Sequence, residues 1–376
     1  MKALFLHFYD FSLHSGVSKK INYQISALKE CGMDVDLCYM TIDENGFQKR
    51  VCGNTVIENY GNGSWASIAK WFRFGALTKF ILENHIEFVY IRSFYNTNPP
   101  LLKMLRKLKA AGIKIVMEIP TYPYDYEVRQ SPLKHRIIFD INLLCRNRLK
   151  CCLTRIVTFS DFDEIHGVKT IKISNGIDFS HIKVKVVRKE ITDNFNLIGV
   201  AEIRFWHGFD RVIQGLGNYY KGKQNIEVHF DIVGDGMPSD INILVKLTKD
   251  LKLEKYIHFH GLTFGDDLEK LFENADFGIA SLGRHRSGIT KIKTLKNREY
   301  AARGIPFIYS EEDSDFETMP YILKAPADES PIDIMGMINF YKTLQPSPAE
   351  IRESIVNTLS WKVQMQKVID ETFNTK

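Results

Sequence analysis

Strand and helix patterns alternate along this chain in two successive series. Residues 1–180 contain short apolar runs of strand type separated by segments of helical periodicity, and a similar series begins at residue 196. Such alternation predicts parallel sheets with helices on both faces. A length of 376 residues is also large for one hydrophobic core. We therefore expect an α/β protein with two Rossmann-like, doubly wound domains that face a central cleft.

The segment between the two series sets the expected domain boundary. Residues 183–196 lose periodicity and gain charge, so the first domain is expected to span 1–182 and the second 183–350. Residues 351–373 have the pattern of one long amphipathic helix that belongs to neither series.

Composition and cysteine usage narrow the class of protein. The net charge of +5, from 50 Lys and Arg against 45 Asp and Glu, is too small to indicate a nucleic-acid partner. The six cysteines show no metal-ligand or C-x-x-C spacing, so we expect reduced, partly buried thiols in a cytoplasmic protein without a metal site. There is no signal-peptide pattern and no run of the ~18 apolar residues that a membrane span needs. Any membrane contact is therefore expected to be peripheral.

One segment suits such a contact. Residues 133–155 combine several Lys and Arg with apolar residues, a pattern typical of a helix that lies on an anionic membrane. An amphipathic helix packed on its own domain explains the segment equally well.

The basic stretch 283–307 is the first candidate site. It contains several Arg and Lys around a single acidic residue, Glu299, and it lies between apolar strand patterns at 275–282 and 304–310. Gly304 is expected to stop a short helix between them. Ligands of parallel sheets bind beyond the carboxyl ends of strands, where helix N-termini favour anions. We expect a phosphate-bearing ligand here, and the alternative is an ordinary solvated loop.

Two further strand ends carry candidate residues. The strand pattern 114–120 leads into TYPYDYE, where the polar side chains suit recognition of hydroxyl groups, although a structural loop would look similar. The expected acceptor-side residues are Glu118, Tyr122, Tyr124 and Asp125, together with Glu127. Glycines follow two other strand patterns, Gly16 after the first and Gly234 after residues 226–233.

Several motifs, in this order, resemble those of the family 4 glycosyltransferases. They are SNGID at 174–178, WHGFDRVIQGL at 206–216, DIVGDG at 231–236, FHGL at 259–262 and REYAARGIPF at 298–307. The stretch Leu-Lys-x-Arg-Glu-Tyr at 295–300 resembles a variant subgroup of bacterial surface-glycan transferases. The resemblance implies the GT-B fold, and SWKVQMQKVID is similar to the last helix of the family, which returns to the first domain. Residues 351–376 are therefore expected to pack on that domain.

The resemblance also implies an activity. A retaining hexosyltransferase of this type moves a sugar from a UDP- or GDP-sugar, bound mainly by the C-terminal domain, to a glycan acceptor held by the N-terminal domain. The acceptor is expected to be lipid-linked and to belong to surface polysaccharide synthesis at the inner face of the plasma membrane. The nucleotide sugar is a co-substrate, and no cofactor or metal ion is expected.

The resemblance also implies roles for individual residues. Glu299 matches the glutamate that binds the ribose hydroxyls, and Gly16 matches the glycine that lets the backbone approach the diphosphate. The expected donor-binding residues are Gly16, Gly234, Arg284, Arg286 and Glu299.

The chain also departs from the family pattern. Lys291 stands where the family has a second glutamate, Glu202 and His207 stand where it has Arg and Lys, and its histidine after the fourth strand has no counterpart in EIPTYPYD. The residues expected to stabilise the leaving diphosphate are Arg204, His207, Lys291 and Lys296.

Two alternatives stay open at this point. One is another GT-B enzyme, such as a sugar-phosphate synthase or a nucleotide-sugar epimerase. The other is a non-catalytic partner subunit, which the replacements at Glu202, His207 and Lys291 motivate.

Overall fold

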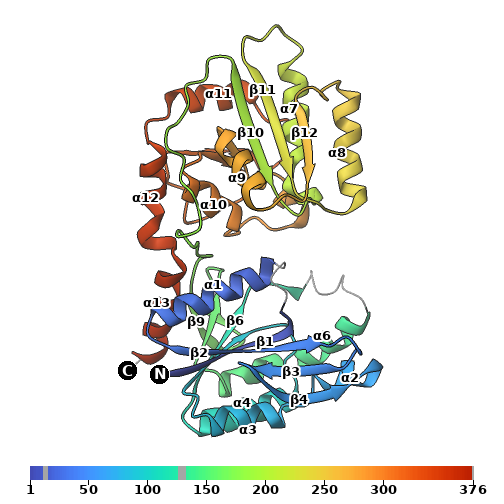
Figure 1. Ribbon diagram of the computed structural model, residues 1–376, viewed down its shortest axis with the longest axis vertical. Coiled ribbons are helices and arrows are strands. Elements are labelled where there is room, and N and C mark those ends of the chain that lie inside the picture. The colour runs from blue at the N-terminus through green and yellow to red at the C-terminus, as the bar shows by residue number, and fades with distance from the viewer. Residues whose placement is uncertain (12–15, 126–132, 375–376) are drawn as a thin grey trace. The chain divides into compact units, whose positions relative to one another are not determined.

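The computed structural model describes residues 1–11, 16–125 and 133–374, and the chain divides into two compact units (Figure 1). Unit 1 consists of Met1–Ser174 and Trp361–Lys376, and unit 2 consists of Asn175–Ser360. The chain thus enters unit 2 after Ser174, where residue 182 was expected as the boundary. It returns to unit 1 at Trp361, where residue 351 was expected.

Unit 1 is built on a nine-stranded sheet with the order β4-β3-β2-β1-β5-β6-β7-β9-β8. The pairs from β2 to β9 are parallel, and the pairs β2–β3, β3–β4 and β8–β9 at the two ends are antiparallel. The strands are β1 Lys2–Asp10, β2 Asp34–Ile42, β3 Gln48–Cys52, β4 Thr55–Gly61, β5 Phe88–Arg92, β6 Lys114–Ile119, β7 Arg155–Thr158, β8 Glu164–Ile165 and β9 Val168–Lys172. The helices are α1 Gly16–Glu30, α2 Gly63–Ala69, α3 Gly75–Glu83, α4 Pro99–Ala110, α6 Leu133–Cys145, the 3-10 helix η1 Arg146–Cys151, and α13 Trp361–Phe373.

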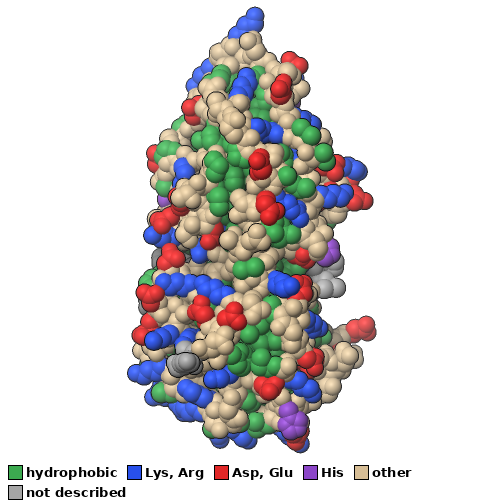
Figure 2. Space-filling model, turned by 90° about the vertical axis from the view of Figure 1, so that its left-hand side faces the viewer, with side chains coloured by type: hydrophobic (Ala, Val, Ile, Leu, Met, Phe, Trp, Pro, Cys, Tyr) green, Lys and Arg blue, Asp and Glu red, His purple; other side chains and the backbone are tan. Residues whose placement is uncertain are grey.

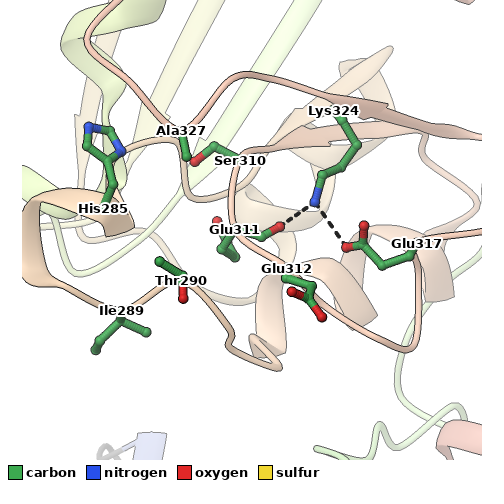
Figure 3. Close-up of a pocket in the computed structure, with 9 residues that line it drawn as sticks. All are labelled: His285, Ile289, Thr290, Ser310, Glu311, Glu312, Glu317, Lys324 and Ala327. Atoms are coloured by element: carbon green, nitrogen blue, oxygen red, sulfur yellow. Dashed lines mark hydrogen bonds and ion pairs between the residues drawn. The ribbon is translucent and has the colours of Figure 1, made fainter.

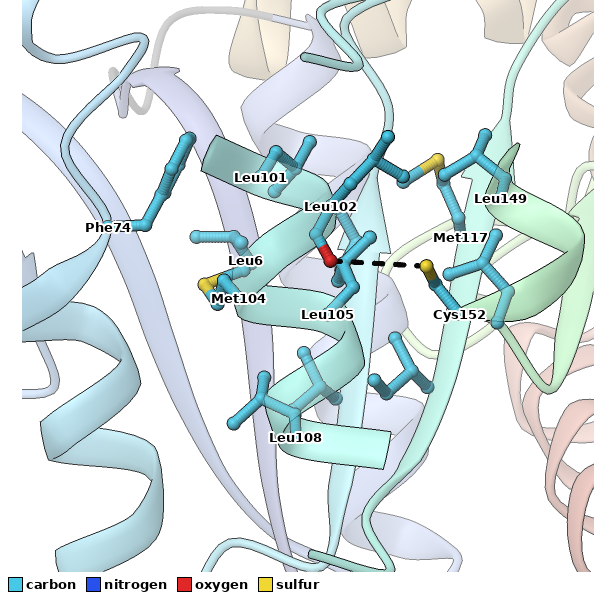
Figure 4. Packing of buried hydrophobic residues seen from close by; sticks show 14 of the residues in the cluster. Leu6, Phe74, Leu101, Leu102, Met104, Leu105, Leu108, Met117, Leu149 and Cys152 are labelled. Atoms are coloured by element: carbon cyan, nitrogen blue, oxygen red, sulfur yellow. Dashed lines mark hydrogen bonds between the residues drawn. The ribbon is translucent and has the colours of Figure 1, made fainter. Parts of the chain in front are cut away.

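Helices cover both faces of this sheet. Side chains that alternate along a strand point to opposite faces, so Phe5 packs with α1 and α13, whereas Leu4 and Leu6 pack with α3 and α4. The second face is shown in Figure 4, where α4 places a run of Leu and Met side chains over the strands, next to Cys152 of the following segment. Strands buried on both faces explain the continuous apolar runs in the sequence.

Unit 2 is built on a six-stranded parallel sheet with the order β12-β11-β10-β13-β14-β15. The strands are β10 Asn194–Val200, β11 Glu227–Val233, β12 Ile257–Gly261, β13 Phe277–Ile279, β14 Phe307–Tyr309 and β15 Ile322–Lys324. The helices are η2 Phe205–His207, α7 Phe209–Tyr219, α8 Pro238–Asp250, α9 Gly265–Asn274, η3 Arg284–Ser287, α10 Leu295–Arg303, α11 Ile334–Thr343 and α12 Pro348–Leu359.

The faces of the second sheet are covered in the same way. Leu197 contributes to the cluster that contains residues of α7, α8 and α11, and Ile198 contributes to the one that contains residues of α9, α10 and α12. The strand β15 and the helix α11 lie in residues for which the sequence patterns predicted no element.

The predicted helix at residues 351–373 is divided into two. Its residues form the later part of α12 and all of α13. The break lies at Ser360, whose backbone is extended (φ −72°, ψ 145°) and bridges Ile177. Helix α12 packs on α10 in unit 2, and only α13 packs on α1 in unit 1. The return of the C-terminal helix to the first domain is therefore confirmed for α13 alone.

The expectation of six reduced cysteines is wrong for one pair. Cys38 of β2 and Cys52 of β3 are directly opposite in the antiparallel register and form a disulfide, whereas Cys31, Cys145, Cys151 and Cys152 are free thiols. Sequence spacing did not reveal this pair because the hairpin register brings the two residues together. Among the described helices, none is long and apolar enough to cross a membrane.

Candidate functional site

The carboxyl ends of β10, β13 and β14 meet at one edge of the sheet in unit 2, where three loops are joined by backbone hydrogen bonds. Leu282 N–H donates to His207 O (2.9 Å) and Ser310 N–H donates to Ser281 O (3.0 Å). The side chains gathered there come from these loops and from the first turn of α10. We call them the strand-end cluster, and its members are Arg204, His207, Ser281, Arg284, Lys296 and Glu311.

Several polar atoms of the cluster are buried without a hydrogen-bond partner among the described residues. They are Ser281 Oγ, Lys296 Nζ and both carboxylate oxygens of Glu311. Glu311 is only 2% exposed, and the stem of Lys296 is partly exposed although its Nζ is not. A buried polar group without a partner costs ~1–3 kcal/mol, so native proteins keep few of them. Their concentration at one strand edge indicates a site that binds a polar ligand.

Burial also shifts the protonation of this pair. Burial raises the pKa of Glu311 to about 7, although the nearby charges of Arg284 and Lys296 oppose the shift. Burial and the repulsion from Arg284 lower the pKa of Lys296 to about 7. Both groups therefore titrate near neutral pH, which is typical of functional sites.

His207 is a neutral member of the cluster. Burial and the charges of Lys296, Arg284 and Arg204 hold its pKa far below the usual range. Its Nδ1 accepts the backbone N–H of Arg204 (3.1 Å), which leaves the imidazole as a fixed support of the loop. His207 therefore cannot stabilise an anion by its own charge at neutral pH, as its expected catalytic role would require.

Arg284 is the guanidinium group whose charge acts on both Lys296 and Glu311, and Arg204 acts on His207. Arg204 forms a partly exposed ion pair with Glu202 (2.6 Å). Glu202 stands where the family has a basic residue, so Arg204, which was expected to supply the missing charge, is paired with the residue at that position. Arg284 lies over the Trp206 ring, with 5.4 Å from its Cζ to the ring centroid. Together with Lys296, they supply the positive charge of the cluster.

Arg286 and Lys291 do not join the cluster. Arg286 donates to both oxygens of Asp210 (2.9 and 2.7 Å) and to Glu329 and Phe205 O, and these acids raise its pKa. It acts as a brace between loops, not as a donor ligand. Lys291 is 62% exposed and pairs with Glu312 (2.8 Å), a contact that contributes little in solvent.

Helix α10 is fixed at both ends. Thr294 caps its N-terminus by accepting from Asn297 N–H, and Gly304 ends it in the left-handed conformation (φ 73°), as the sequence predicted. Arg298, fully buried, donates to both oxygens of Asp313 (2.6 and 3.1 Å) and to Asn175 O (3.0 Å). The N-terminal turn of α10, which carries Lys296, is thereby held against the segment that carries Glu311.

Glu299 lies in the middle of the same helix. It is one-third exposed, and its Oε1 accepts from Arg303 Nη2 at 3.1 Å. Arg303 forms a second ion pair with Glu269 of α9 (2.7 Å). One carboxylate oxygen of Glu299 thus has a protein partner, and the exposed remainder of the group can accept from a ligand's hydroxyls.

Gly234 has a steric reason for its position. Its φ is 121°, and a Cβ placed there would lie 1.8 Å from Ala201 O. The close approach of the loops after β10 and β11 therefore requires glycine. This constraint explains the residue without any contact to a ligand.

A cavity of about 430 Å³ opens beside Glu311 (Figure 3). Its wall is formed by the loop after β13, the segment after β14, and β15. The lining residues are His285, Ile289, Thr290, Ser310, Glu311, Glu312, Glu317, Lys324 and Ala327. Lys324 Nζ donates to Glu317 Oε1 (3.0 Å) and to the backbone oxygen of Glu311, as the dashed lines in Figure 3 show.

In unit 1, Glu118 is not positioned for acceptor recognition. It is fully buried, and its oxygens accept from Gln24 Nε2 and Tyr90 Oη (2.6 Å each) and from Arg92. Burial opposes its ionisation, but Lys20, Arg92 and the hydrogen bonds outweigh burial and lower its pKa. Glu118 is a buried charged anchor of the sheet, a position that its strand-end location alone did not distinguish from a ligand site.

The other expected acceptor-side residues form an aromatic group beyond β6. Tyr124 is buried and shares a hydrogen bond of 2.8 Å with His166 Nε2, and the Tyr122 ring lies against Tyr124. Asp125 accepts two hydrogen bonds from Arg146 (2.7 and 3.1 Å). Glu127 lies outside the described residues. Gly16 is the first residue of α1.

Sequence reasoning missed two residues of these regions. His166, at the β8–β9 turn, places an imidazole beside Tyr124, although the segment EIPTYPYD itself contains no histidine. Burial lowers the pKa of His166 to about 4. Glu311 directly follows the predicted strand 304–310, so its place at a strand end, like that of Glu118, is the sequence signal that could have marked it as a candidate. The turn that delivers His166 left no comparable signal.

Surface charge and possible metal ligands were the remaining candidate features of a site. On the face shown in Figure 2, basic and acidic side chains are interspersed, without a continuous basic surface. Among the residues that the structure describes, no group of three or more His, Cys, Asp or Glu is arranged to hold a metal ion.

No family model and no curated relative matches this sequence. Solved structures do match it along its full length. HepE from Anabaena, in complex with UDP, is 13% identical, with 100% of both chains covered and a TM-score of 0.63. Sucrose-phosphate synthase from Thermosynechococcus elongatus is 12% identical over 98% of this chain and 97% of that one, with a TM-score of 0.67.

A third similar structure is WaaG, a glycosyltransferase involved in lipopolysaccharide biosynthesis. It is 12% identical, covers 99% of this chain and 100% of its own, and has a TM-score of 0.57. Identities this low establish the fold alone. The expected fold class is confirmed: the chain has two Rossmann-like α/β units of the GT-B type.

Proposed function

We propose that this protein is a glycosyltransferase that takes a sugar from a nucleotide-sugar donor bound by unit 2. The observation that carries the proposal is the strand-end cluster, where buried atoms of Ser281, Lys296 and Glu311 lack partners among the described residues. A donor molecule would supply those partners. The resemblance of HepE, whose structure contains UDP, supports a uridine nucleotide as the first candidate.

The diphosphate of the donor would bind to the cationic part of the cluster. Lys296 lies in the first turn of α10, and the charges of Lys296, Arg284 and Arg204 all act on His207; helix N-termini also favour anions. Negative charge increases on this diphosphate as the sugar leaves, so fixed cations there stabilise the transition state. A nearby phosphate also favours the charged form of Lys296, so donor binding above pH 7 is accompanied by proton uptake. Glu299 is the proposed ribose ligand.

The finer aspects of the reaction follow from the family resemblance. We propose transfer with retained anomeric configuration, without a divalent ion, to a lipid-linked glycan of the bacterial surface. WaaG, which acts in lipopolysaccharide biosynthesis, supports this class of acceptor. Tyr122 and Asp125 are the proposed acceptor-side residues, and the proposed location is the cytoplasmic face of the plasma membrane.

Helix α6 is the proposed membrane contact. Its side chains Ile137 and Leu144 are 56% and 80% exposed, and Arg148 of the following turn is also exposed. Apolar residues flanked by cations suit an anionic lipid surface. Sedimentation with phosphatidylglycerol vesicles at low salt tests this contact. Leu144→Asp should lose the bound fraction and Ile243→Asp on α8, which is 61% exposed, should retain it; equal binding of both variants would refute the contact.

Binding and turnover measurements test the proposed activity. Thermal shift with UDP, GDP and a panel of their sugars should identify a stabilising ligand, because binding to the folded state raises its stability. Nucleotide release should then require an acceptor, and NMR of the product should show the donor's anomeric configuration. Release without acceptor would indicate a hydrolase, and conversion of the donor into its epimer without net release would indicate an epimerase. Absence of any nucleotide binding would leave the non-catalytic partner subunit.

A further inference from the structure

Glu311 has a property that the proposed diphosphate site does not use. Glu311 is one of the residues that line the 430 Å³ cavity, and its buried carboxylate oxygens have no hydrogen-bond partner on another described residue. The two other carboxylates of that cavity are paired, Glu312 with Lys291 (2.8 Å) and Glu317 with Lys324 (3.0 Å). Glu311 is therefore the acceptor that the folded chain leaves for a ligand in this cavity.

The surroundings hold Glu311 in a fixed position. Glu312 N–H donates to Thr290 O (2.7 Å) and Ile292 N–H donates to Glu312 O (2.9 Å), which joins the loop after η3 to the segment after β14. Two residues further on, Asp313 is held by Arg298. A carboxylate held on both sides of its backbone is suited to precise recognition.

The charged side chains differ between the two neighbouring regions, which suits a ligand with two chemically different parts. Arg284 and Lys296 lie near the amino end of α10, whereas the cavity wall carries Glu311 and two ion-paired carboxylates, Glu312 and Glu317. A diphosphate is favoured by the first region. An uncharged group rich in hydroxyls fits the second, because an ionised carboxylate accepts from two hydroxyls, and Thr290 and Ser310 add neutral hydroxyl groups. The volume lies within the ~300–1,000 Å³ typical of small-ligand sites.

We propose that Glu311 binds two hydroxyls of the sugar to be transferred and so contributes to the choice of donor sugar. The inference rests on the proposed function, since it places the sugar of the same nucleotide donor in the cavity beside the cluster. Glu311 would thus contact the substrate directly. The gain in affinity that the sugar adds to the free nucleotide would then require the carboxylate to be ionised.

Calorimetry on the full chain tests this role with pairs of probes. UDP is compared with UDP-glucose, UDP-galactose and UDP-N-acetylglucosamine, and GDP with GDP-mannose, at pH 8. The measured quantity is the ratio of the nucleotide's Kd to that of its best sugar conjugate. We expect Glu311→Gln to lower this ratio at least tenfold while changing the Kd of the free nucleotide less than twofold. Glu353→Gln, an exposed position on α12, is the matched control and should change neither.

The pH dependence gives a second, independent readout. In the wild type, the ratio should fall as the pH decreases from 8 to 6, because Glu311 takes up a proton, and the variant should show no such fall. An unchanged ratio in Glu311→Gln, or an equal loss of nucleotide and conjugate, would overturn the proposal. So would a wild type that binds the nucleotide but gains nothing from any sugar. A wild type that binds neither probe would instead refute the proposed function itself.

Discussion

Replacement of Glu311 by glutamine should make the protein more stable at neutral and alkaline pH. The pKa of Glu311 is raised from 4.5 to about 7 by burial, and each pKa unit corresponds to ~1.4 kcal/mol. Ionisation of this group in the folded, ligand-free protein therefore costs ~3 kcal/mol. Glutamine has nearly the same shape and never ionises, so it removes that cost.

The sign of the pH dependence follows from linkage. Because the folded-state pKa lies above the unfolded value, the stability that Glu311 contributes is fully present below about pH 4.5 and is lost as the pH rises through 7. Glu311→Gln should thus equal the wild type near pH 4.5 and exceed it by ~3 kcal/mol above pH 7. Lys296 is largely neutral above pH 7, so the loss of its attraction to Glu311 offsets little of this gain.

Urea unfolding at several pH values between 5 and 8 measures the effect. Glu317→Gln is a matched control with the opposite sign, since Glu317 accepts from Asp313 N–H (2.9 Å) and Tyr309 Oη–H (3.0 Å). Burial opposes its ionisation, but these hydrogen bonds and Lys324 lower its pKa, so its contribution is present above pH 4.5 and is lost in acid. A Glu311→Gln variant that is no more stable than the wild type at pH 8, or equally displaced at pH 5 and pH 8, would refute the reasoning.

Four other perturbations test separate parts of the structure and of the proposed reaction. Arg298→Met should cost ~3–5 kcal/mol in urea unfolding because it leaves the buried carboxylate of Asp313 unpaired, and a loss below ~1 kcal/mol would contradict the geometry. Gly234→Ala should lower the melting temperature strongly, because the new Cβ would meet Ala201 O at 1.8 Å, and an unchanged melting temperature would show that this loop can move. Glu299→Ala should weaken UDP binding about tenfold in calorimetry through loss of the ribose contact. Transfer should survive EDTA, and complete loss with recovery on Mn²⁺ would show that a metal ion is required.

Periodicity predicted the general fold because strands that are buried on both sheet faces have apolar residues at consecutive positions. It did not find the break at Ser360, since α12 and α13 continue one apolar pattern while they pack on different units. The Cys38–Cys52 disulfide depends on hairpin register, and register is decided by pairing across strands, not by spacing along one.

The candidate site was predictable in place but not in detail. The expectation that strand ends and the start of α10 form a site found Arg204, Arg284 and Lys296, which the structure brings together. The same expectation could not distinguish charged side chains that are available to bind a ligand from those that form ion pairs within the protein. Arg286 and Glu118 looked like ligands in the sequence, yet their hydrogen bonds are made within the fold. That distinction depends on tertiary partners that local sequence does not reveal.

The buried ion pair at Arg298 has a practical consequence for protein engineering. A library that randomises the whole basic stretch would mostly yield unfolded variants, because Arg286, Arg298 and Arg303 join segments of unit 2 through acids. Lysine would not substitute at Arg298, since only the planar fork reaches both oxygens of Asp313. Diversity confined to the residues that face the cavity, with Arg284 and Lys296 kept for the diphosphate, is expected to change sugar preference while the scaffold that carries them stays intact.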